Sequence, residues 1–140
     1  MWLKLPSAAF WGLRVHYCDS EKASVGIPFS WFTQNPFRST YFAAQCGAGE
    51  MSTGLLAMAA IRGAGKVSML VTNIEAQFAK KATSLVVFTC YEGKQIAEAV
   101  ERAVNTGEAQ TYTATSVGIQ QRDGQEVTSI RVTWSFKVKG

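Results

Sequence analysis

The sequence is poor in the residues that bind metal ions or form disulfides. It has one histidine, His16, and three widely spaced cysteines, Cys18, Cys46 and Cys90, without a CxxC pair. A structural or catalytic zinc site needs three or four such ligands, so we expect no metal site. An odd number of separated cysteines favours reduced, buried thiols, which are typical of a cytoplasmic protein.

The sequence also lacks a long apolar run. Its longest weakly polar stretch, Thr40 to Ile61, contains Gln45 and Glu50 and is rich in glycine, which is unlike a membrane span. Residues 1–6 lack the apolar core and the cleavage site of a signal peptide. We therefore expect neither a leader nor a membrane partner.

Runs of like charge are missing as well. The 14 Lys and Arg residues are scattered, and the net charge of +4 is modest, so no nucleic-acid partner is expected. The 140 residues are 47% apolar and 17% charged, which is typical of a globular chain. No linker or repeat divides it, and we expect one domain over residues 1–140.

Apolar periodicity predicts one long helix among strands. A second, shorter helix is expected near residues 95–104, but residues 96–100 also alternate well enough to form a strand. The order favours an α+β fold in which an antiparallel sheet curls around the long helix. The expected strands are 12–18, 23–32, 68–79, 85–91, 110–120 and 126–139, and the expected helices are 40–61 and 95–104.

The long helix has an unusual composition, because Ala, Gly and Ser fill most of it. Each glycine inside a helix costs about 1 kcal/mol, so close approach of the surrounding sheet is the expected reason. Gly63 and Gly65 should end the helix. The residues expected to be buried against Leu56 and Ala60 of this helix are Leu70, Ile74, Phe78, Val87, Ile130, Val132, Trp134 and Phe136.

Residues 35–54 carry a resemblance to a known family. Many hotdog thioesterases have an asparagine, a His-Gly-Gly six residues later, and an acidic residue nine positions after the histidine, on the central helix. Here Asn35 and Glu50 occupy the first and last positions, and Tyr41-Phe42-Ala43 replaces His-Gly-Gly. Together with Trp134 to Val138, the stretch resembles an uncharacterised, thioesterase-like branch of the hotdog superfamily. The resemblance implies the hotdog fold, an antiparallel sheet wrapped around one central helix.

Glu50 is the candidate catalytic residue. A carboxylate among small and apolar helix residues is costly to bury unless it is used or paired. It would serve as a base that activates water, or as a nucleophile, against a thioester carbonyl. The alternative is a solvent-exposed Glu50, or one paired with Arg38, Arg62 or a lysine.

The start of the helix is the candidate binding site. Backbone N–H groups near Tyr41 and Phe42 are expected to stabilise an oxyanion, and Asn35 would orient water or substrate, although Asn before Pro is also an ordinary turn residue. Nine helical residues rise about 13 Å, so one carbonyl does not reach both Tyr41 and Glu50 of the same helix. A complete site therefore needs two subunits, as in hotdog dimers.

Two functions remain open at this point. The first is a dimeric hydrolase of acyl-CoA or acyl-carrier thioesters, with no cofactor except coenzyme A as part of the substrate. The second is a binding protein of the same fold that holds an acyl or aromatic ligand without cleaving it, which the bulky Tyr41 and Phe42 favour. A dehydratase would need a histidine, and His16 is badly placed for that role. The expected partners are an acyl-thioester small molecule and a second copy, with pairing into a tetramer left open.

Overall fold

The computed structural model describes residues 11–139 and contains six strands and two helices in that range. The strands form one antiparallel sheet in the order β1-β2-β4-β5-β6-β3. In chain order the elements are β1 (Arg14–Cys18), β2 (Ala23–Ile27), α2 (Phe42–Arg62), β3 (Val67–Phe78), β4 (Val86–Cys90), α3 (Gly93–Thr106), β5 (Gln110–Gln120) and β6 (Gln125–Val138).

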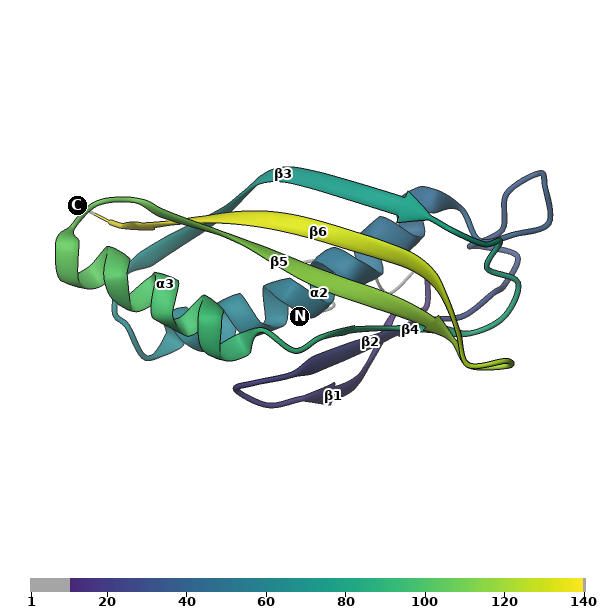
Figure 1. The fold of residues 1–140 in the computed structure, drawn as a ribbon, viewed down its shortest axis with the longest axis horizontal. Coiled ribbons are helices and arrows are strands. Elements are labelled where there is room, and N and C mark those ends of the chain that lie inside the picture. The colour runs from purple at the N-terminus through teal and green to yellow at the C-terminus, as the bar shows by residue number, and fades with distance from the viewer. Residues whose placement is uncertain (1–10, 140) are drawn as a thin grey trace.

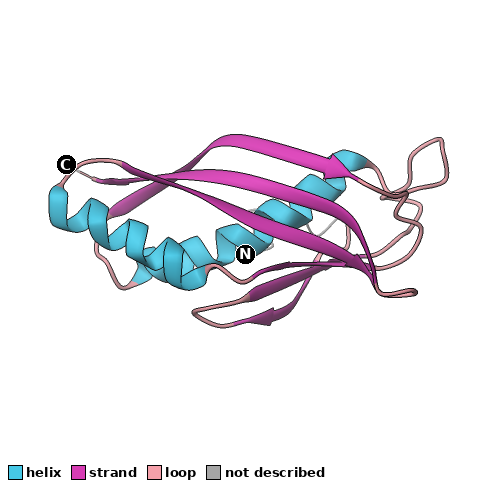
Figure 2. Cartoon of the chain, in the orientation of Figure 1, coloured by secondary structure: helices cyan, strands magenta, loops and turns pink. Residues whose placement is uncertain are grey.

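The sheet curls along the long helix α2, and the shorter α3 packs beside it at the opposite end from the loops before α2 (Figures 1 and 2). The predicted α+β fold is confirmed. Close contact explains the small residues of α2: a Cβ atom on Gly49 would lie 2.7 Å from Ile130 Cδ1 of β6, and one on Gly54 would lie 3.3 Å from the Trp134 ring. Side chains of β6, rather than backbone, fill this space.

The predicted element order is confirmed. The helix predicted over 95–104 is present and longer, over Gly93–Thr106, because its buried residues recur at helical spacing. The second strand is shorter than predicted and ends at Ile27. None of the helices in the described part of the chain is long and apolar enough to cross a membrane.

The predicted core is right for β6 and wrong for β3. Ile130, Val132, Trp134 and Phe136 are buried, whereas Leu70, Ile74 and Phe78 are 66%, 41% and 45% exposed. Val87 is half-buried, and its neighbours Val86 and Phe88 fill the core.

A β-bulge causes part of the error in β3. The register with β6 shifts between Val71 and Asn73, so the alternation changes face at this point. Leu70 pairs with Ser135 on the outer face, and Ile74 pairs with the buried Val132 on the inner face. Ile74 and Phe78 therefore face the helix side of the sheet, yet nothing in the described chain covers them fully.

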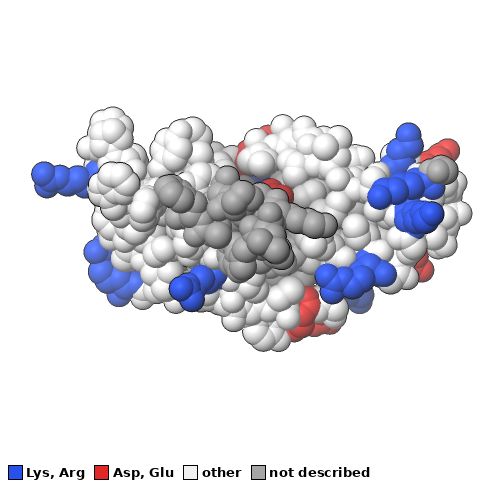
Figure 3. Space-filling model, turned by 180° about the vertical axis from the view of Figure 1, so that it is seen from behind, with Lys and Arg blue, Asp and Glu red and all other residues white. Residues whose placement is uncertain are grey.

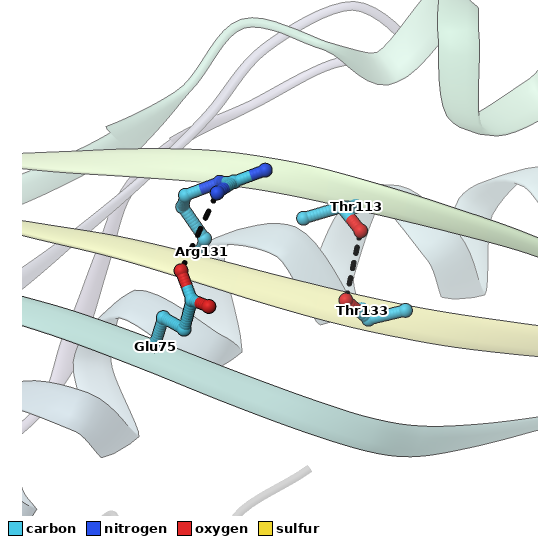
Figure 4. Close-up of polar contacts among 4 residues, drawn as sticks. All are labelled: Glu75, Thr113, Arg131 and Thr133. Carbon is cyan, nitrogen blue, oxygen red and sulfur yellow. Dashed lines mark hydrogen bonds and ion pairs between the residues drawn. The ribbon is translucent and has the colours of Figure 1, made fainter.

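The outer face of the sheet is polar. Thr113 of β5 and Thr133 of β6 share a hydrogen bond of 2.8 Å, and Arg131 of β6 pairs with Glu75 of β3 at 3.3 Å (Figure 4). Both charged side chains are more than half exposed, so their attraction contributes little to stability. None of these four residues is a candidate for catalysis or ligand binding.

Candidate active site

Glu50 lies in the third turn of α2 and is half-buried. Gly54, one turn later, leaves room beside its carboxylate: a Cβ atom there would lie 3.5 Å from Glu50 Oε1. Below this turn, the Trp134 indole donates a hydrogen bond to Thr53 Oγ1 at 2.8 Å, and the Thr53 hydroxyl donates to the Glu50 carbonyl, also at 2.8 Å. The backbone that carries Glu50 is thus fixed to β6.

The carboxylate itself has no partner in the described part of the chain. No hydrogen bond or ion pair to Glu50 Oε1 or Oε2 is present among residues 11–139, so the predicted alternative of pairing with Arg38 or Arg62 is not observed. Burial disfavours the charged form and raises the pKa of Glu50 above its usual value. A half-buried carboxylate with a raised pKa is a stronger proton acceptor than an exposed one.

Glu92 provides a contrast within the same molecule. Its carboxylate accepts hydrogen bonds from the Tyr112 hydroxyl at 2.5 Å and from the Thr115 N–H at 2.7 Å. Both oxygens of Glu92 are therefore engaged in attaching the start of α3 to β5, as expected of a structural carboxylate. Glu50 has no comparable structural task.

The first turn of α2 supplies backbone donors. Tyr41, the residue before the helix, donates its N–H to the Thr33 carbonyl at 2.6 Å, so this N–H does not serve as the oxyanion donor that the sequence suggested. The side chain of Tyr41, the N-cap residue, makes no capping hydrogen bond. The N–H groups of Phe42 and Ala43 consequently lack an acceptor among the described residues, at the positive end of the helix dipole.

A cleft of about 350 Å³ opens beside this helix start. Phe42 and Phe78 form an apolar wall, with ring centroids 6.3 Å apart. Lys80 and Lys81 lie at the exposed rim. Its other lining residues are Asn35, Ser39, Thr40, Gln45, Ala79 and Ala82. An apolar wall beside basic side chains suits a ligand with an apolar part and an anionic part.

Asn35 lines the cleft but is largely occupied by a turn. Its Oδ1 accepts the N–H groups of Phe37 at 2.9 Å and Ser39 at 3.2 Å, and its Nδ2 donates to Ser39 Oγ at 3.0 Å. One Nδ2 hydrogen is left for a ligand. The turn that precedes α2 thus depends on this side chain.

Sequence reasoning missed Gln45. This buried amide accepts a hydrogen bond from the Thr128 hydroxyl of β6 and donates one to the Thr40 carbonyl at 3.3 Å. It fixes the segment before the helix to the sheet and forms part of the cleft lining. The available signal was an amide among the small residues of the helix, since buried polar groups are paired.

The predicted site residues fall into two places. Asn35 and Phe42 line the cleft, but Tyr41 is exposed at the helix start and Glu50 is not part of the lining. Phe42 and Glu50 are eight residues apart on one helix, a rise of about 12 Å. Within one subunit, the helix-start donors and the carboxylate therefore do not meet.

Neither His16 nor Cys46 is suited to catalysis at this site. His16 is an exposed residue of the edge strand β1 and lies over Gly26. Cys46 is half-buried one turn before Glu50, and burial raises the pKa of its thiol, which disfavours the nucleophilic thiolate. Among residues 11–139, no group of His, Cys, Asp and Glu could hold a metal ion.

An antiparallel sheet curled around a central helix is the arrangement of the hotdog fold. The profile of a domain of unknown function, DUF4442, matches residues 1–136. The chain belongs to this family. No curated protein matches the chain.

Solved structures confirm the hotdog fold. PA5026 from Pseudomonas aeruginosa, a protein of unknown function and probable thioesterase, is similar with a TM-score of 0.83 and 15% identity, over 99% of this chain and 91% of that one. OLEI01261 from Chlorobaculum tepidum, of unknown function, has a TM-score of 0.81 and 11% identity, over 96% and 88%. The thioesterase HI1161 from Haemophilus influenzae has a TM-score of 0.69 and 12% identity, over 94% and 82%.

Proposed function

We propose that the protein hydrolyses acyl-CoA or acyl-carrier thioesters as a homodimer, with Glu50 as the general base. The observation that carries this proposal is the half-buried Glu50 carboxylate on the central helix, which has no partner within residues 11–139 and a pKa raised by burial. The thioesterases among the structures of the same fold support it.

The proposed reaction follows from the chemistry of the two places. Glu50 removes a proton from water, and the water oxygen attacks the thioester carbonyl carbon. The N–H groups of Phe42 and Ala43 of the partner subunit stabilise the oxyanion. The C–S bond then breaks, and the proton held by Glu50 passes to the leaving thiolate, which yields a carboxylic acid and a thiol.

The exposed edge of β3 supports the dimer. β3 is an end strand of 12 residues, so a row of backbone groups has no partner strand in the described chain. Its inner-face residues Ile74 and Phe78 are 41% and 45% exposed. A second copy that pairs along this edge would cover both side chains. It would also bring its own helix-start N–H groups to complete the site at Glu50.

A binding protein without activity is the second candidate. Tyr41 and Phe42, with ring centroids 5.0 Å apart, occupy the place where small residues would let a substrate approach the backbone. In this case the cleft holds the acyl ligand, and Glu50 has no catalytic task.

Release of free thiol from a panel of acyl-CoA thioesters separates the two candidates. Glu50→Gln keeps the shape but removes the proton acceptor, so turnover should fall about a hundredfold or more. Glu75→Gln, on the outer face, is the matched control and should keep full turnover. Equal turnover by Glu50→Gln and wild type would refute the assignment, and ligand binding without thiol release by wild type would establish the binding protein.

A further inference from the structure

Three loops meet at one end of the molecule, which we name the loop end: residues 28–41, 79–85 and 121–124 (Figure 1). The Thr40 N–H donates to the Ala82 carbonyl at 2.8 Å, and the Arg122 guanidinium donates to Thr83 Oγ1 at 3.0 Å. These bonds fix the loops to one another, so their tips form one surface.

The loop end is positively charged. Its three loops contain four basic residues and one acidic residue, a net charge of +3 out of +4 for the whole chain. Figure 3 shows Lys and Arg without Asp or Glu at its left-hand end, which is this end of the molecule. The four basic side chains are exposed and form no ion pair within residues 11–139: Arg38, Lys80, Lys81 and Arg122.

The loop end is also aromatic. Four of the eight exposed aromatic side chains of the described residues lie in its loops, and two more, Phe42 and Phe78, directly adjoin them in sequence. Trp31 and Phe37 are the most exposed, at 77% and 71%. Each lies in a turn at a loop tip: Ser30 accepts the backbone N–H groups of two residues that follow Trp31, and Asn35 holds the turn that contains Phe37. Large apolar groups gathered at one exposed end mark an interaction surface.

We propose that the loop end binds the surface of an anionic phospholipid membrane. Trp31 and Phe37 would enter the interfacial region, where aromatic rings are favoured. Arg38, Lys80 and Lys81 would contact the lipid phosphates, and the surface potential of an anionic leaflet attracts them.

The exposed rings lie in separate turns, Trp31 against its neighbour Phe32 in one and Phe37 in the next, and this arrangement favours a lipid surface over a protein partner. A fluid interface accepts separate rings without a matching shape, whereas a protein partner needs a complementary, well-packed surface. Surface binding needs no spanning helix, so the proposal goes beyond the sequence-based expectation of no membrane partner, which rested on the lack of a spanning segment and of a leader. The cleft of about 350 Å³ has Lys80 and Lys81 at its rim and would open towards the lipid. The proposal is independent of thioester hydrolysis.

Sedimentation with vesicles tests the proposal. The full chain should bind vesicles of equal parts phosphatidylglycerol and phosphatidylcholine, and binding should weaken with salt and be much weaker to phosphatidylcholine alone. Lys80→Gln with Lys81→Gln should weaken binding about 25-fold, since each basic residue near an anionic leaflet contributes about fivefold. Trp31→Ala with Phe37→Ala should weaken it by at least tenfold.

The controls lie away from the loop end. Lys94→Gln with Arg102→Gln removes two exposed charges of α3, and Tyr91→Ala removes an aromatic ring that is 70% exposed; both should leave vesicle binding unchanged. Absence of binding, or equal losses in the α3 control, would overturn the proposal. So would self-association that Trp31→Ala with Phe37→Ala abolishes, or binding to an acidic acyl-carrier protein without binding to vesicles.

Discussion

β3 and β6 lie side by side in the sheet, have 12 and 14 residues, and both alternate apolar with polar side chains. Their inner faces differ. Phe136 of β6 is fully buried, whereas Phe78 of β3 is 45% exposed although its side chain faces the same side of the sheet. An apolar pattern predicts which side chains need cover. It does not predict whether the same chain provides that cover.

A matched pair of truncations should give the largest difference between the strands. Phe136→Ala removes a fully buried ring and should lower the free energy of unfolding by about 3 to 5 kcal/mol. Phe78→Ala, at a concentration low enough to keep the chain monomeric, should cost less than about 1 kcal/mol. Urea unfolding measures both, and equal losses would mean that the inner face of β3 is as well packed as that of β6.

A charge on the inner face of β3 should act on assembly rather than on folding. Ile74→Asp should weaken the proposed dimer at least tenfold, because the partner would have to bury the new carboxylate. Leu70→Asp, on the outer face of the same strand, is the control and should leave the dimer intact. Analytical ultracentrifugation across a concentration series reports the change, and a wild type that stays monomeric at micromolar concentration would contradict the dimer.

These two strands also show the limit of sequence reasoning. The inner face of β6 was predictable because Ile130 to Phe136 alternate without interruption. The bulge after Val71 left no signature in the residue pattern, so the prediction placed Leu70 on the wrong face.

At the site, the sequence indicated Glu50 because a carboxylate stands among small helix residues. It did not reveal that Tyr41 N–H is already bonded to Thr33, or that Gln45 joins the helix to β6. Both facts depend on contacts between segments that only the folded chain brings together.

The smallest expected effect concerns Glu50 and pH. Burial raises its pKa in the folded state, so the folded protein binds this proton more tightly than the unfolded chain does. Stability should therefore fall as pH rises above the unfolded pKa of Glu50, and the penalty should be complete once pH exceeds the folded pKa. Glu50→Gln should raise Tm at pH 7 and leave it nearly unchanged at acidic pH, where Glu50 is protonated. A lower Tm at pH 7 would indicate a stabilising partner for the carboxylate.

The central claim is a site that needs Glu50 from one subunit and the helix start of the other, and it can be tested by mixing two variants. Phe42→Pro removes one N–H donor at the first helical position, where proline is well tolerated, and the extended Tyr41 (φ −60°, ψ 133°) is compatible with a following proline. Phe42→Ala, which keeps the N–H, controls for loss of the ring.

Thiol release from an acyl-CoA substrate should be low for dimers of Glu50→Gln and for dimers of Phe42→Pro. After subunit exchange at equal amounts, half of the dimers are mixed, and each mixed dimer has one site with both groups intact. We expect recovery to about a quarter of wild-type turnover. Exchanged dimers that remain as inactive as the two parents would contradict the shared site.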